Sequence, residues 1–179
     1  MNISWVIAPE FKIEFEIREV GPVWGSDIAA RYFDIDNVVC FDYSRVANLI
    51  SRNFQRTCNF YIPQGFYKDL GRPPSVNLVG GDFSSEVSQK EELVSLHLVK
   101  DTSDIVLLGG FDLSLNEEES DKDIIHKKSN FLNSVHRLVK SSESIQWVVV
   151  DNATEIDERF ANLSNITQDS AENIISYFS

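Results

Sequence analysis

Cysteine, histidine and long apolar runs are all scarce in this chain, and each shortage removes a class of protein. The two cysteines, Cys40 and Cys58, lie in apolar stretches, which predicts buried free thiols and not the disulfide framework of a small secreted domain. No apolar run reaches the roughly 18 residues that a membrane-spanning helix needs. The N-terminal residues lack the basic region of a signal peptide. The sequence therefore predicts a cytoplasmic protein that does not engage a membrane.

Motifs with a defined chemistry are missing as well. The three histidines, His97, His126 and His136, do not stand at the spacing of a zinc site, and no C-x-x-C pair is present. The glycine-rich phosphate-binding patterns G-x-G-x-x-G and G-x-x-x-x-G-K-S/T do not occur, and neither does the G-x-S-x-G of serine hydrolases. We therefore predict no catalytic residue, no metal ion and no cofactor, and lean against enzymatic activity.

Basic residues are outnumbered by acidic ones. Lys and Arg number 16 against 28 Asp and Glu, which gives a formal charge of −12. This charge predicts no direct binding to nucleic acid or anionic membranes, because both depend on Lys and Arg. The same charge would accelerate encounter with a cationic protein. An acidic surface also keeps a protein soluble without any such partner, so both interpretations stand.

The chain does have enough apolar side chains to build a core. Hydrophobic residues make up 42% of it and aromatic residues 11%, which is the opposite of a disordered composition. Its length suits one hydrophobic core, and no linker or low-complexity tract interrupts it. We expect residues 1–179 to form a single globular domain.

Two stretches decide the expected sheet topology. Residues 11–19 alternate apolar and charged side chains, which predicts an antiparallel-type strand with one solvent-exposed face. Residues 84–100 fit a helix, because their start has capping-box spacing, or a hairpin strand, because apolar and polar side chains alternate from Val94 to Leu98. We favour the hairpin, preceded by a short helix. This predicts an α+β fold, a mainly antiparallel sheet with helices packed on it; the helix would favour a three-layer α/β fold with a largely parallel sheet.

Periodicity and turn residues predict the remaining elements. Strands are expected at 3–8, 38–41, 58–62, 76–79, 105–108 and 145–150. Helices are expected at 27–33, from Asp42 or Ser44 to Gln55, and at 122–140, 154–163 and 168–178. Loops are expected at 21–26 and 63–74. The helix of 122–140 has the clearest apolar stripe.

Strand ends carry the residues that suggest ligand chemistry. Gly80-Gly81 and Gly109-Gly110 each follow an expected strand, where backbone N–H groups could receive a phosphate. Carboxylates at such ends can bind Mg²⁺. The strand-end carboxylates are Asp42, Asp82, Asp112 and Asp151. An alternative function is therefore a Mg-dependent or nucleotide-binding enzyme, and the plainer interpretation is that these residues form turns and helix caps.

An acidic cluster precedes and enters the helix of 122–140. Asp112 lies shortly before the cluster in the chain. Together the candidate residues are Asp112, Glu117, Glu118, Glu119, Asp121 and Asp123. We predict that they bind a basic protein partner, a toxin or a nucleic-acid-binding protein, and neutralise or inhibit it. Bacterial immunity proteins and phage-encoded inhibitors work in this way, which is a class-level analogy. The other interpretation is a solvated loop whose charges favour the helix N-terminus.

A third function is that of a structural or assembly subunit. Trp24, Phe66 and Tyr67 fall in expected loops, and exposed aromatic side chains are typical of interfaces. They can equally fold back onto the core. The sequence leaves the oligomeric state open.

Overall fold

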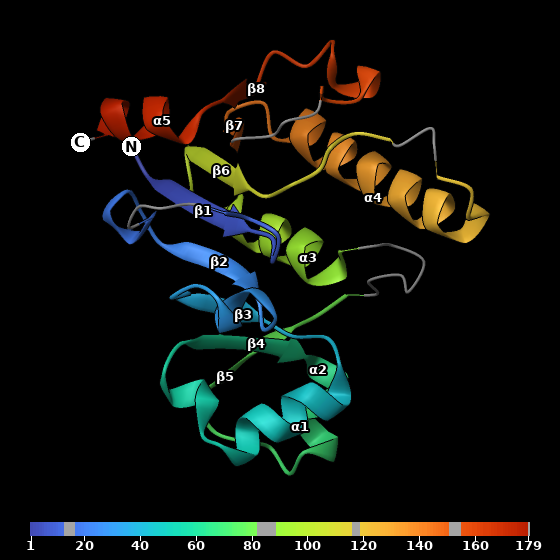
Figure 1. Cartoon of the computed structure of the whole chain (residues 1–179). Helices are drawn as coiled ribbons and strands as arrows, with labels where there is room; N and C mark the ends of the chain where they lie inside the picture. Colours follow the sequence, from blue (N-terminus) through green and yellow to red (C-terminus); the bar gives the residue numbers. More distant parts are fainter. Residues whose placement is uncertain (13–16, 82–88, 116–118, 151–154, 179) are drawn as a thin grey trace.

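The strands of the chain form one sheet in which every neighbouring pair is parallel. The computed structural model describes residues 1–12, 17–81, 89–115, 119–150 and 155–178. The strand order is β5-β4-β3-β2-β1-β6-β7-β8 (Figure 1). The strands are β1 (Ile3–Ile7), β2 (Val23–Ser26), β3 (Asn37–Val39), β4 (Asn59–Pro63), β5 (Val76–Val79), β6 (Ile105–Gly109), β7 (Gln146–Val150) and β8 (Ile166–Asp169). All of them end at the same edge of the sheet, here called the carboxyl edge.

Helices cover both faces of the sheet and complete a three-layer arrangement. The α-helices are α1 (Tyr43–Ser51), α2 (Gln64–Asp69), α3 (Lys90–Val99), α4 (Lys122–Ser141) and α5 (Ala171–Phe178). Single turns of 3-10 helix are η1 (Ile17–Glu19), η2 (Ala29–Arg31), η3 (Phe54–Arg56) and η4 (Glu158–Phe160). The helices α3 and α4 share one face of the sheet, whereas α1, α2 and α5 contribute to the core on the other face.

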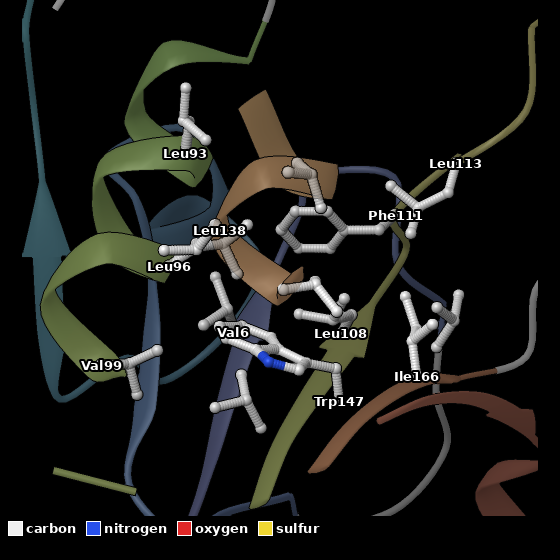
Figure 2. Close-up of a cluster of buried hydrophobic side chains, with 14 of the residues drawn as sticks. Val6, Leu93, Leu96, Val99, Leu108, Phe111, Leu113, Leu138, Trp147 and Ile166 are labelled. Carbon is white, nitrogen blue, oxygen red and sulfur yellow. The ribbon is translucent and has the colours of Figure 1, made fainter. Parts of the chain in front are cut away.

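Large buried side chains occupy the space between the sheet and the helices α3 and α4. Trp147 of β7 is fully buried there together with Leu108 of β6. Figure 2 shows Leu96 of α3 and Leu138 of α4 in the same cluster. Because burial of one large apolar side chain contributes roughly 1.5–3 kcal/mol, this cluster is a main source of the stability of the fold.

The predicted α+β fold with a mainly antiparallel sheet is wrong, and the α/β alternative is the correct one. The hairpin expected within 84–100 is the helix α3 where the residues are described. This helix contacts both the sheet and the neighbouring helix α4, so Leu93, Val94 and Leu96 are buried although they point in different directions. A helix that is buried on several sides has no single apolar stripe. The alternation of apolar and polar residues from Val94 to Leu98 therefore resembled the pattern of a strand.

The strand predicted at 11–19 is also wrong where it can be checked. Residues 13–16 lie outside the described residues, and Ile17–Glu19 form the 3-10 turn η1. Phe11 and Ile17 do enter the core beside Trp5, as the apolar half of the pattern indicated. Because β1 and β2 are parallel neighbours, the chain between them must cross from the carboxyl edge back to the opposite edge. This connection is therefore a crossover, and its described residues form no strand of the sheet.

Short elements account for the other differences. The loop expected at 21–26 contains β2, and the loop expected at 63–74 contains α2. The helix expected at 154–163 is the single turn η4 where it is described, and β8 was not expected. Trp24, expected in an exposed loop, is 8% exposed because it lies in β2. Three- and four-residue strands are too short to produce a readable alternation.

Several predictions about local structure are confirmed. The other expected strands lie within a residue or two of β1 and β3 to β7, and α4 covers the predicted helix. Asp42 caps α1 and is one of the two residues expected to begin that helix. Cys40 and Cys58 are free thiols, the first buried and the second half-buried.

Candidate functional site

The carboxyl edge is where doubly wound α/β sheets bind ligands, at the point where the strand order reverses. In this sheet the chain runs from β1 outwards to β5 and then returns to β6 on the other side of β1. The reversal point is therefore the crevice between the ends of β1 and β6. Gly109 and Gly110 lie at this position, and the sequence suggested that backbone N–H groups beside them could bind a phosphate.

Phe11 fills this crevice. A Cβ atom on Gly109 would lie 2.8 Å from the Phe11 ring, and one on Gly110 would lie 2.7 Å from the Phe11 amide nitrogen. Gly110 has a φ of +73°, and the Ala8 amide donates to the Gly109 carbonyl at 2.9 Å. The two glycines thus permit a turn and a close approach of the chain to itself. A phosphate would have to displace an apolar side chain from this place.

The strand-end aspartates do not converge on one site. Asp42 follows β3 and Asp112 follows β6, three strand spacings away, which is roughly 14 Å. Asp42 accepts a hydrogen bond from Ser44 Oγ at 2.7 Å and caps its helix. Asp82 and Asp151 lie outside the described residues. Across the described ranges, no three His, Cys, Asp or Glu side chains are placed to hold a metal ion.

The acidic residues predicted to bind a partner lie around the start of α4. Glu117 and Glu118 fall outside the described residues. Asp121 accepts a hydrogen bond from the Asp123 amide at 2.9 Å, and Glu119 accepts one from the Asp121 amide at 2.9 Å. Two of these carboxylates therefore stabilise the helix start, as the plainer interpretation of the sequence expected.

Asp112 is held by local partners too. Its carboxylate accepts hydrogen bonds from Ser114 and from Lys128, whose Nζ lies 3.0 Å away. Burial alone would raise the pKa of Asp112, but these hydrogen bonds lower it below its usual range. Asp112 and Glu119 line a hollow of about 310 Å³ together with Lys127 and Lys128. The region is thus mixed in charge and not uniformly acidic.

A polar cluster that sequence reasoning missed lies on the same edge, at the ends of β2 and β3. Arg45, in the first turn of α1, is its centre. Arg45 Nη2 donates to Glu91 Oε1 at 2.9 Å, and Nη1 lies 3.3 Å from Asp27 Oδ1. Burial alone would lower the pKa of Arg45, but Asp27 and Glu91 are among the groups that raise it above its ordinary value. One guanidinium thereby joins the end of β2 to the start of α3.

Two titratable groups of this cluster are closed off from solvent. Glu92 is 4% exposed, and burial raises its pKa to about 7, with Glu91 acting in the same direction against a hydrogen bond from Ser26. Burial likewise raises the pKa of Cys40, and Asp27 adds to the effect. The Cys40 thiol therefore stays protonated near neutral pH and does not act as a nucleophile.

A groove of about 510 Å³ opens between η2 and α1 and reaches this cluster. Arg31 of η2 and Arg45 and Arg52 of α1 and its C-cap line it, and Asp27 is the acid among the lining residues. Arg31 and Arg52 are exposed, and among the described residues neither has an ion-pair partner. The groove is therefore positive on a chain whose formal charge is −12.

Sequence reasoning missed this site because its residues come from separate elements and follow no motif. The segment 21–26 was expected to be a loop, which hid the fact that Asp27 directly follows a buried strand. One signal was present: Arg45 and Arg52 are seven positions apart in an expected helix, so they lie on one face of it. The pairing of Arg45 with Asp27 and Glu91 could not be inferred, because it depends on how β2, α1 and α3 meet.

None of the helices in the described part of the chain combines the length and the apolar composition that a membrane span requires. No family model, no curated protein and no solved structure matches the chain.

Proposed function

We propose that the chain is an α/β ligand-binding domain whose groove between η2 and α1 receives a small anionic molecule. The observation that carries this proposal is the sign of the charge in the groove. Arg31, Arg45 and Arg52 line it against one carboxylate, whereas the chain as a whole is strongly acidic. Guanidinium groups suit phosphate and carboxylate ligands because they present a rigid fork of N–H donors.

The position and size of the groove support the same function. It lies beside the ends of β2 and β3, at the edge where α/β sheets bind their ligands. Its volume of about 510 Å³ falls in the range of small-molecule pockets, roughly 300–1,000 Å³. Because Arg45 is engaged by Asp27 and Glu91, we assign the anion to Arg31 and Arg52.

Calorimetric titration with inorganic phosphate tests the proposal. We expect saturable binding by the wild type and a loss of about tenfold or more in the Arg31→Ala/Arg52→Ala variant, because a hydrogen bond to a charged group contributes roughly 1.5–3 kcal/mol. Both side chains are exposed, so the variant should remain folded. Arg56→Ala, an exposed arginine of η3 outside the groove, is the matched control. Equal phosphate affinity in the double variant and the wild type would contradict the proposal.

The second candidate is the acidic domain that neutralises a cationic protein, in a cytoplasmic setting. The observation that favours it is the exposure of Asp112, Asp121 and Asp123 together around the start of α4. Such a surface would raise the rate at which a toxin or another basic protein associates. The neighbouring lysines Lys127 and Lys128 reduce the local charge, which is why this function takes second place.

Association kinetics with a panel of basic nucleases test this second candidate. We expect the association rate to fall by about tenfold or more between about 50 mM and 300 mM salt, because exposed charges are screened. Asp123→Lys should slow association further, while Asp121 still caps α4. Glu143→Lys, on an exposed residue after α4, gives the same change of charge away from the cluster. Binding that ignores ionic strength would count against an electrostatic inhibitor.

A further inference from the structure

The inner end of the groove contains a carboxylate, which a site for a bare anion would not need. Asp27 lines the groove, and its side chain is 3% exposed. Its Oδ1 has no hydrogen-bond partner among the described residues, although Arg45 Nη1 lies 3.3 Å away. A buried oxygen without a hydrogen bond is costly, so Asp27, although its charge is paired with that of Arg45, still has an acceptor position for a ligand donor.

The acceptor and the exposed cation Arg52 lie at different ends of the groove. Asp27 pairs with Arg45 near the start of α1, and Arg52 is the C-cap residue of the same helix. Seven residues of helix separate the two arginines, which corresponds to roughly 10 Å along the axis. Asn48 lies between them on the groove wall. This separation matches a molecule several atoms long with unlike groups at its ends.

We infer that the groove takes a phosphate ester that also carries free hydroxyl groups, such as a sugar or polyol phosphate. The phosphate binds Arg31 and Arg52, and a hydroxyl donates to Asp27. In nucleotide-binding sheets of this class an acidic residue some way beyond the first strand accepts hydrogen bonds from ribose hydroxyls, which shows that a carboxylate suits this task. This inference rests on the proposed function, because it needs the anion in the same groove.

A bare anion explains the groove less well. The carboxylate of Asp27 is paired with Arg45, and it offers a phosphate placed beside it an acceptor and no donor. A ligand with a donor at one end and a negative group at the other satisfies both Asp27 and the two exposed arginines.

Comparing ligands on the wild-type protein tests the inference without any mutation. Calorimetry with ribose 5-phosphate and with pentyl phosphate, which has no hydroxyl group, should give about 10- to 100-fold tighter binding of the former, because a hydrogen bond to a charged acceptor is gained. Glycerol 3-phosphate separates a short polyol phosphate from a pentose phosphate as the better source of this chemistry. Equal affinities for ribose 5-phosphate and pentyl phosphate would overturn the inference and leave the anion site standing.

The variant Asp27→Asn should reduce this preference, because the amide oxygen still accepts a hydrogen bond but carries no charge. We expect it to bind pentyl phosphate at least as tightly as the wild type does, because a negative charge is gone. Asp69→Asn, an exposed residue of α2, is the matched control and should keep the preference. Retained binding of pentyl phosphate shows that the Asp27→Asn protein is folded; if it is not, the ligand comparison on the wild type decides. Retention of the full preference by a folded Asp27→Asn protein would overturn the inference.

Discussion

Two parts of the carboxyl edge differ in whether a side chain of the protein occupies them. At the ends of β1 and β6, where α/β sheets usually bind ligands, Phe11 occupies the crevice against Gly109 and Gly110. At the ends of β2 and β3, only one or two strands away, Asp27 and Arg45 form a polar cluster that opens into a groove. The comparison teaches that topology alone does not locate a site, because side chains decide which part of the edge remains open.

The two parts also differ in the kind of side chain that lines them. The crevice is apolar, and the Phe11 and Trp5 ring centroids lie 5.8 Å apart, so an aromatic side chain already occupies the place of a ligand. In the polar cluster Arg45 faces carboxylates from two other elements, while a buried oxygen of Asp27 lacks a hydrogen bond. A polar site that is incompletely satisfied is a better candidate for binding than a filled apolar one.

The largest expected effect comes from emptying the filled crevice. Phe11 is 5% exposed, so Phe11→Ala should lower the free energy of unfolding by about 3–5 kcal/mol through lost burial and a residual cavity. Urea denaturation measures this change. Under conditions where the variant is folded, phosphate binding in the groove should be unaffected, because the groove does not include Phe11.

A matched substitution separates the crevice from a general loss of aromatic surface. Phe66 of α2 is half-buried and packs edge-on against Tyr43, so Phe66→Ala should be clearly less destabilising than Phe11→Ala. If Phe11→Ala lowered the free energy of unfolding no more than Phe66→Ala does, Phe11 would not fill the crevice.

A smaller effect, with a distinctive pH dependence, is expected at Glu92 in the polar cluster. The folded pKa of Glu92 is about 7 against an ordinary value of 4.5. Between these values the folded state keeps a proton that the unfolded chain has lost, so stability falls as pH rises, and the loss is complete above about pH 7. Glu92→Gln has no proton to lose. It should exceed the wild type by up to about 3 kcal/mol at pH 8 and by little near pH 4.

Thermal and urea unfolding from pH 4 to 8 measure this difference. Glu143→Gln, which changes an exposed carboxyl after α4, is the control and should show no comparable trend. If the wild type and Glu92→Gln differ by the same amount at every pH, Glu92 does not hold its proton in the folded state.

A good part of the local structure could be predicted from neighbouring residues. The stripe of α4 and the cap at Asp42 depend on residues within a turn or two of one another, so they could be predicted from the sequence. The helix α3 was predicted wrongly because its contacts with both the sheet and α4 bury it on several sides and leave no single apolar stripe. The groove was missed because no spacing links Asp27 to Arg45.

The sequence by itself determined where most strands and helices lie, that both cysteines stay free, and that no familiar catalytic motif is present. Only the tertiary structure decided that the strands run parallel, that Phe11 closes the crevice, and that Arg45 meets Asp27 and Glu91. The physical reason is the separation along the chain over which each interaction acts. Periodicity and capping act between residues a few positions apart, whereas strand direction and the convergence of charges depend on contacts between segments that are distant in the chain.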